Sequence, residues 1–132
     1  MKKTLFLLIT LSMSLFAQLT NEFPTQSIIN KKIPIVDIRT KPEWKQTGLL
    51  KNAIPITFFY AGGRYNVKKF IKELKSKVDV TKPFAIICHT GNRTAIVSDF
   101  LANQLHYKVI NLKGGMNYAT QVQHLKTFPY KP

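Results

Sequence analysis

The sequence predicts an α/β fold, a three-layer sandwich with a mostly parallel central sheet flanked by helices. Three observations favour it. Apolar segments of strand length alternate along the chain with amphipathic segments of helical period. The 132 residues and the 45% hydrophobic content suit one compact domain. No repeat or low-complexity linker divides the chain. Because strands that alternate with helices pair in parallel through crossover helices, the chain is expected to form these layers.

Four segments are predicted as strands. Three of them are mostly apolar, rich in β-branched residues and short enough to be buried on both faces of a sheet: Ile33–Ile38, Phe84–Cys88 and Lys108–Leu112. The fourth, Ala53–Ile56, contains Pro55. Since proline cannot donate to a neighbouring strand, this segment is expected near an edge of the sheet.

The predicted helices have patterns of two strengths. Apolar residues recur at three- and four-residue spacing over Val67–Val78 and Ala95–Leu105, and lysines occupy the other face of the first segment. Weaker helical patterns cover Pro42–Gln46 and Met116–Lys126. The tail, Thr127–Pro132, carries two prolines and is expected to lie extended on the surface.

Residues 1–17 are predicted to be a secretory signal peptide. Lys2 and Lys3 precede an apolar run that is too short to span a bilayer comfortably and that ends at the small residue Ala17. Cleavage there would leave a single domain of residues 18–132, without a stable membrane anchor, in the periplasm or another extracytoplasmic compartment. The alternatives are an uncleaved N-terminal anchor and a buried segment of the fold.

The charge balance indicates anionic partners. Twenty Lys and Arg residues face six Asp and Glu residues, which gives a formal net charge of +14. This excess suits small anions or an acidic protein. Nucleic acid is not expected as a partner, because the chain is predicted to be exported and shows no basic stripe interleaved with aromatic residues.

Cys88, the one cysteine of the sequence, excludes an internal disulfide and a cysteine-rich zinc site. No group of His, Asp and Glu residues has the spacing of metal ligands. Neither a metal nor another cofactor is therefore expected.

Cys88 is also the candidate nucleophile. It ends the most apolar predicted strand, and ligands of open parallel sheets lie beyond the carboxyl ends of the strands. A short loop then leads into a predicted helix, and its residues are His89, Thr90, Gly91, Asn92 and Arg93. A loop that wraps over a helix start points backbone N–H groups inward, and the helix dipole adds positive potential. This arrangement favours a thiolate that attacks an anionic substrate.

Two residues of the loop have further expected roles. Gly91 allows the backbone to turn with positive φ. Arg93 supplies a fixed charge that can hold the loop carbonyls or bind an oxyanion. The structural alternative is that Cys88 is a buried hydrophobic residue at a strand end, which free cysteine often is.

Four segments together resemble single-domain rhodaneses, a family of sulfurtransferases. The loop Cys88–Arg93 resembles the family's active-site loop, and Val36–Arg39 resembles its Asp-Val-Arg strand end. Leu112–Met116 is similar to its late Leu-x-Gly-Gly turn, and Gly48–Ile56 resembles part of its Gly-His-Ile-x-Gly-Ala segment. The likeness extends over about residues 24–126.

The resemblance implies a rhodanese-like fold and a mechanism. Cys88 would take a sulfane sulfur from an anionic donor, thiosulfate or a persulfide, and pass it as a persulfide to a thiol acceptor. The backbone amides of the loop that begins at His89 and ends at Arg93 would cradle the persulfide. Asp37 and Arg39 would brace this loop from the neighbouring strand end.

Two other functions remain open. One is a persulfide carrier or binding module that docks an acidic protein without turning over a free small molecule. The other is a phosphatase or arsenate reductase, since these enzymes also use a loop between a cysteine and an arginine. Four residues separate Cys88 from Arg93, whereas phosphatases of the related fold commonly use five, and the loop contains no Asp that would act as a general acid.

Overall fold

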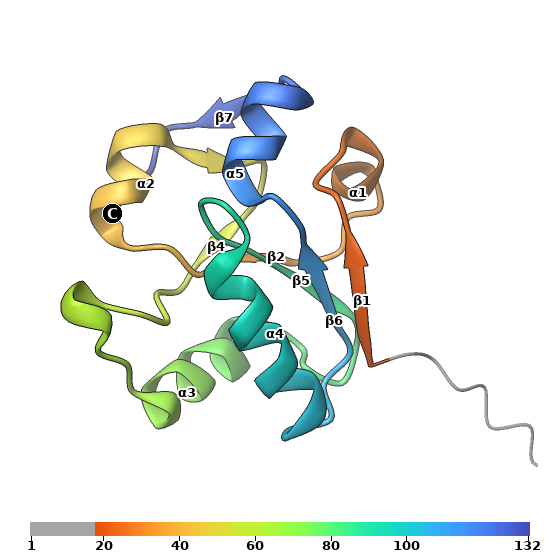
Figure 1. The fold of residues 1–132 in the computed structure, drawn as a ribbon, viewed down its shortest axis with the longest axis vertical. Coiled ribbons are helices and arrows are strands. Elements are labelled where there is room, and N and C mark those ends of the chain that lie inside the picture. Colours follow the sequence, from red (N-terminus) through yellow and green to blue (C-terminus); the bar gives the residue numbers. More distant parts are fainter. Residues whose placement is uncertain (1–17) are drawn as a thin grey trace, which may run out of the picture.

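Residues 18–132 are described by a computed structural model (Figure 1). The predicted signal peptide, residues 1–17, lies outside the described residues. At the centre is a five-stranded sheet in the order β1-β6-β5-β2-β4, in which every pair of neighbours is parallel. Its strands are β1 Leu19–Glu22, β2 Ile35–Asp37, β4 Ile54–Pro55, β5 Phe84–Ile87 and β6 Val109–Leu112. The predicted parallel α/β architecture is confirmed, with β4 at an edge.

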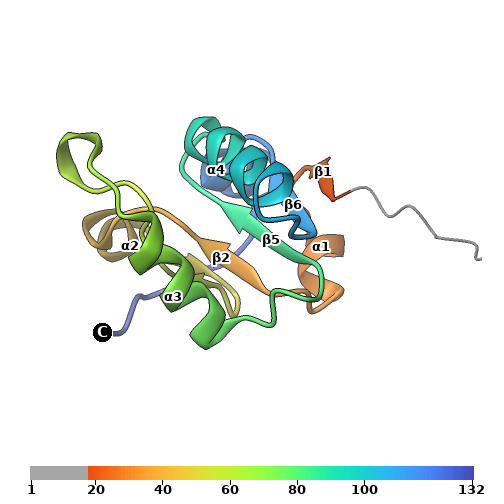
Figure 2. The ribbon, with the colours of Figure 1, turned by 90° about the horizontal axis from the view of Figure 1, so that it is seen from below.

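Helices cover both faces of this sheet (Figure 2). Helices α3 (Val67–Lys77) and α4 (Asn92–Asn103) lie on one face, and α1 (Gln26–Asn30) and α5 (Gly115–Asn117) lie on the other. Side chains alternate along β5 accordingly. Phe84 and Ile86 pack with α3 and α4, whereas Ala85 and Ile87 pack with α1 and α5. The sheet and the helices on its two faces therefore form three layers, with one apolar core between the sheet and each helical layer.

The α2 helix (Lys41–Thr47) follows β2 and lies near the carboxyl edge of the sheet. Its start is fixed by a capping box, in which the Thr40 hydroxyl accepts from the backbone N–H of Glu43 and the Glu43 carboxylate accepts from the backbone N–H of Thr40. It ends at Gly48, whose φ is 75°. The capping box thus gives the predicted helix a defined first turn and places Glu43 at the sheet edge.

The C-terminal tail differs from the prediction in one respect. It is extended, but residues Thr127–Phe128 form a strand, β7, that pairs antiparallel with β3 (Leu49–Leu50). Tyr130 then packs against Trp44 of α2, with ring centroids 5.4 Å apart. The tail is therefore part of a second small sheet rather than a segment that only lies on the surface.

The helix predicted over 116–126 is shorter than expected. After α5 the chain continues as a π-helical turn, Tyr118–Val122, and then leaves helical structure. Within residues 18–132, no helix combines the length and apolar character needed to cross a membrane.

Candidate functional site

Cys88 lies where the sequence predicts it, directly after β5 at the carboxyl edge of the sheet and before α4. It is a free cysteine. Its Sγ accepts a hydrogen bond from the backbone N–H of Gly91 at 3.2 Å and lies 3.5 Å from the hydroxyl oxygen of Thr94. Gly91 has a φ of 98°, as its predicted role requires. The loop therefore turns back over the sulfur, which has two polar neighbours, the Gly91 N–H of the loop and the Thr94 hydroxyl of α4.

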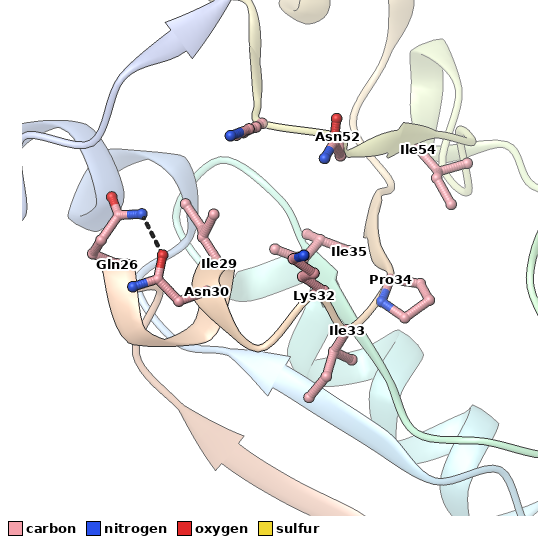
Figure 3. Close-up of a pocket in the computed structure, with 10 residues that line it drawn as sticks. Gln26, Ile29, Asn30, Lys32, Ile33, Pro34, Ile35, Asn52 and Ile54 are labelled. Atoms are coloured by element: carbon pink, nitrogen blue, oxygen red, sulfur yellow. Dashed lines mark hydrogen bonds between the residues drawn. The ribbon is translucent and has the colours of Figure 1, made fainter.

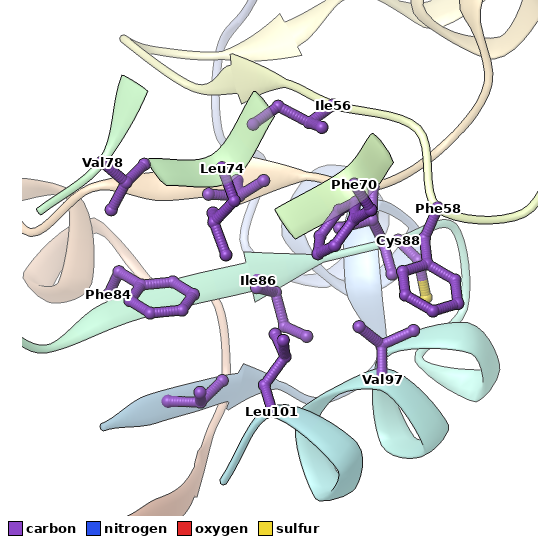
Figure 4. Packing of buried hydrophobic residues seen from close by; sticks show 13 residues of the cluster. Ile56, Phe58, Phe70, Leu74, Val78, Phe84, Ile86, Cys88, Val97 and Leu101 are labelled. Carbon is purple, nitrogen blue, oxygen red and sulfur yellow. The ribbon is translucent and has the colours of Figure 1, made fainter. Parts of the chain in front are cut away.

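The other side of the sulfur is apolar. Cys88 belongs to the core between the sheet and the helices α3 and α4, where Phe58, Phe70 and Val97 are among its neighbours in the cluster (Figure 4). Only 1% of the residue is exposed. The thiol thus lies at a boundary between a polar loop and the hydrophobic core, shielded from water.

Arg93 joins the loop to α2. Its guanidinium donates two hydrogen bonds to the Glu43 carboxylate, at 2.9 and 2.6 Å, and each side chain is 26% exposed. The expected contact of Arg93 with the loop carbonyls does not occur, because Glu43 offers a charged, bidentate partner. Hydrogen bonding from Arg93 is the main reason that the pKa of Glu43 falls from 4.5 to about 2.

The lowered pKa of Glu43 predicts an effect on acid stability. A carboxyl with a folded-state pKa below its unfolded value stabilises the protein above the unfolded value, and this contribution is lost as the pH falls through the folded one. We therefore expect wild type to exceed Glu43→Gln in free energy of unfolding by up to about 1 kcal/mol at neutral pH. The difference should shrink between pH 4.5 and about 2.

Denaturant titrations at a series of pH values measure this difference. Glu73→Gln is the matched control, because Glu73 lies on α3 and forms no ion pair with Arg93. A gap between wild type and Glu43→Gln that stays constant down to pH values near 2 would contradict the assignment.

Asp37 and Arg39 brace the site indirectly. Both are wholly buried, and the Arg39 guanidinium binds the Asp37 carboxylate at 2.7 Å. Arg39 also donates to the Thr47 hydroxyl and to the Gly48 carbonyl, each at 2.7 Å. Thr47 and Gly48 lie at the end of α2, so the buried pair of Asp37 and Arg39 anchors the helix that carries Glu43. The connection to the cysteine loop then runs through the pair of Glu43 and Arg93.

A second contact with the loop comes from α5, which begins at the Gly-Gly turn. The backbone N–H of Met116 donates to the Cys88 carbonyl at 2.8 Å, and that of Asn117 donates to the His89 carbonyl at 2.9 Å. A Cβ on Gly115 would collide with the Cys88 carbonyl oxygen and lie 2.6 Å from that of His89. The Gly-Gly turn is therefore a backbone clamp on the cysteine loop.

Sequence reasoning left three of these contributors without a role. Glu43 was visible only as an acidic residue beside Trp44, and Gly115 only as part of a motif. Thr94 directly follows the predicted loop and was not assigned a function. The sequence does hold one signal for Glu43: its spacing from Thr40 fits a capping box and could have placed it in the first turn of a helix.

Two cavities lie at opposite edges of the sheet. The larger, about 640 Å³, is lined by residues at the amino-terminal ends of β2 and β4, including Ile35 and Ile54 (Figure 3). A smaller one, about 390 Å³, includes Gly91 and Asn92 in its wall. Because ligands of parallel sheets bind beyond the carboxyl ends of the strands, the smaller cavity is the one relevant to Cys88. Within residues 18–132, no group of three or more His, Cys, Asp or Glu side chains is placed to hold a metal ion.

We compared the chain with known protein families and proteins. The family model for the rhodanese-like domain matches residues 21–120. The uncharacterized protein RP600 of Rickettsia prowazekii is 31% identical over 91 residues, which span 67% of this chain and 72% of that protein.

Solved structures agree in fold. Rv0390 from Mycobacterium tuberculosis has a TM-score of 0.59 at 17% identity, covering 73% of this chain and 79% of that chain. A rhodanese-like domain protein from Staphylococcus aureus has a TM-score of 0.55 at 24% identity, covering 74% and 89%. At these identities the likeness concerns the fold.

Proposed function

Because the chain belongs to the rhodanese-like domain family, we propose that it is a sulfurtransferase that carries sulfane sulfur on Cys88. The observation that carries the proposal is the hydrogen bond from the Gly91 N–H to the Cys88 Sγ, 3.2 Å long, at the carboxyl edge of the sheet. This sulfur lies beside a backbone donor and the positive end of the 12-residue helix α4, a place where negative charge on a bound group is stabilised. The same environment suits a persulfide, whose outer sulfur also bears negative charge.

The reaction has two displacements. In the first, the Cys88 thiolate attacks the sulfane sulfur of an anionic donor such as thiosulfate. The Sγ–S bond forms, the donor's S–S bond breaks, and sulfite leaves with the electron pair. In the second, an acceptor thiolate attacks the outer sulfur, and Cys88 leaves as a thiolate. No net oxidation or external reductant is required.

Access to the sulfur constrains the first displacement. Since Cys88 is 1% exposed, a donor reaches Sγ only after the groups that cover it shift. The positive charge of the chain favours approach of an anion to this edge.

The test is the intact mass of the protein after incubation with thiosulfate and, separately, with a small-molecule persulfide. We expect the wild type to gain one sulfur atom, and dithiothreitol to remove it, whereas Cys88→Ser gains none. Ser98→Ala is the matched control, because Ser98 is also buried on α4 but bonds only the Ala95 carbonyl. The proposal fails if the wild type takes up no sulfur from either donor.

We also propose that the chain is exported after removal of residues 1–17. The sequence pattern supports this, because Lys2 and Lys3 precede an apolar run that ends at the small residue Ala17. Every described element lies after Ala17, so cleavage there would leave all of them intact. The mass of the protein isolated from its native host tests the proposal, since retention of residues 1–17 would contradict it.

A further inference from the structure

The outer face of α3 concentrates positive charge. Six of the chain's 20 basic residues lie within residues 64–77, where the one acidic residue is Glu73. Lys68, Lys72 and Lys75 have the spacing that places side chains on one stripe of a helix, and all three are exposed. We name these three residues the lysine stripe. Because a helix rises about 1.5 Å per residue, the stripe extends over roughly 10 Å.

The charge of the lysine stripe is not neutralised by an ion pair. The two ion pairs within residues 18–132 both use arginines, Arg39 and Arg93. Lys68 and Lys72 lie four residues apart, a spacing at which like charges on a helix repel each other. An acidic partner would remove this repulsion, so the stripe is complementary to an extended run of negative charge.

An exposed aromatic side chain lies at the amino-terminal end of the lysine stripe. The loop before α3 is closed by the Tyr60 N–H, which donates to the Arg64 carbonyl at 2.7 Å. Tyr65 follows this closure and is 60% exposed, and its ring stacks on the Phe58 ring with centroids 5.8 Å apart. Tyrosine is enriched where proteins bind one another, because its ring buries a large area at a low cost in entropy. The loop thus adds an apolar contact to the charged stripe.

Tyr65 also connects this surface to the cysteine. The Phe58 ring lies 4.8 Å from that of Phe70 on α3, and both residues belong to the core cluster that contains Cys88 (Figure 4). Tyr65 is therefore the exposed end of an aromatic group whose buried members line the apolar side of the thiol. A partner that binds Tyr65 contacts this group directly.

We propose that the lysine stripe and Tyr65 dock an acidic segment of a protein that carries the acceptor thiol. A small inorganic anion would contact one or two lysines, whereas a run of Asp and Glu spans the whole stripe. A lipid surface does not suit this helix, because the apolar face of α3, with Phe70 and Leu74, is packed into the core and cannot insert among lipids.

The role of the docked protein as acceptor rests on the proposed function. Its thiolate attacks the outer sulfur of the Cys88 persulfide, and the Sγ–S bond breaks. The products are a persulfide on the partner and the Cys88 thiolate.

The binding test uses a fluorescent peptide of Glu residues around a central Leu-Ser pair, in which Ser replaces the acceptor cysteine. Its anisotropy should show saturable binding to the wild-type protein, and a peptide with Gln in place of Glu should bind at least tenfold more weakly. Replacing Lys68, Lys72 and Lys75 together with Gln should weaken binding of the Glu peptide about tenfold, roughly a factor of two for each exposed ion pair lost.

The matched control removes the same charge elsewhere on the surface. Its substitutions are Lys31→Gln, Lys51→Gln and Lys126→Gln, at exposed lysines outside α3. Equal weakening in the two triple variants would show attraction by net charge alone and would overturn the docking surface. Tyr65→Ala should weaken binding severalfold, whereas Val122→Ala, at a side chain with a similar exposed fraction of 56%, should not. Equal binding by these two variants would overturn the contact with Tyr65.

The transfer test uses the same peptides with Cys in place of Ser as acceptors from the sulfur-loaded protein. At low ionic strength, kcat/KM for the Glu peptide should exceed that for the Gln peptide about tenfold, and the ratio should approach one as salt is added. The variant without the lysine stripe should lose this preference, and the control variant should keep it.

The outcomes separate this inference from the proposed function. Sulfur loading together with equal binding of the Glu and Gln peptides overturns the docking surface and leaves the sulfurtransferase proposal intact. Binding of the Glu peptide that depends on the lysine stripe, in a protein that never takes up sulfur, supports the docking surface and overturns its role in transfer. Two other polyanions are offered as competitors, vesicles of phosphatidylserine with phosphatidylcholine and an oligothymidylate with the charge of the peptide. Tighter binding of either one through the stripe overturns the assignment to a protein partner.

Discussion

Replacing Arg39 with methionine is expected to lower the free energy of unfolding by about 3–5 kcal/mol, because it leaves the Asp37 carboxylate buried without its counter-charge. Arg39 and Asp37 are both wholly inaccessible to water. The substitution also removes the donors to Thr47 and Gly48, so the end of α2 loses two hydrogen bonds. Equilibrium unfolding in denaturant measures the loss.

Arg64→Met is the matched control for Arg39→Met. Arg64 is exposed, and its side chain makes one hydrogen bond, 3.3 Å long, to the Ala61 carbonyl. We expect this variant to remain within about 0.5 kcal/mol of wild type. Adding Asp37→Asn to Arg39→Met should restore part of the loss, since the uncompensated charge is then gone. A double variant less stable than Arg39→Met would show that the buried charge is not the cause.

Replacing Gly115 with alanine is expected to lower the rate of sulfur transfer about 10²-fold, the size of effect that a displacement of about 1 Å at a reacting group produces. The new Cβ would collide with the Cys88 carbonyl oxygen and come within 2.6 Å of the His89 carbonyl oxygen. These two carbonyls accept the hydrogen bonds from α5 that hold the cysteine loop. Single-turnover transfer from a sulfur-loaded protein measures the rate of this step.

Gly62→Ala separates the collision from backbone strain. Gly62 has a φ of 75°, a left-handed conformation like that of Gly115, but a Cβ there would meet no atom within 4 Å. We expect Gly62→Ala to lose a little stability and to transfer sulfur at the wild-type rate. Equal loss of transfer in the two variants would refute the clamp by the Gly-Gly turn.

The elements that sequence predicts well are those with a strong hydrophobic period. Apolar runs mark β2, β5 and β6, and α3 carries buried Phe70 and Leu74 opposite a lysine face. The resemblance to rhodaneses drawn from the motifs is confirmed by the family match over residues 21–120.

Short elements stabilised by distant partners were not predicted. The edge strand β1 has four residues and a mixed burial pattern, so it has no clear alternation, and it is ordered by pairing with β6. The two-residue strands β3 and β7 exist only because the tail returns to the turn after α2. Local sequence carries little information about such contacts, because their energy comes from residues far along the chain.

In the candidate site too, some features follow from local sequence and others depend on contacts between distant residues. The position of Cys88 and the turn at Gly91 follow from local sequence, since a strand, a glycine and a helix succeed one another. The partner of Arg93 does not, because Glu43 lies on another helix and comes close only when α2 is anchored by the buried pair of Asp37 and Arg39. Pairwise charge contacts between elements require the assembled fold.

The pairing of β1 with β6 has a consequence for biogenesis. Leu19 lies opposite Val109, so β1 can pair with its neighbour in the sheet only after β6 has been synthesised. The sheet is therefore incomplete while the ribosome still holds the C-terminal quarter of the chain, and a high contact order slows folding further. Under the export that we propose, this delay gives a translocase that accepts only unstructured substrates time to capture the nascent polypeptide before its tertiary structure closes.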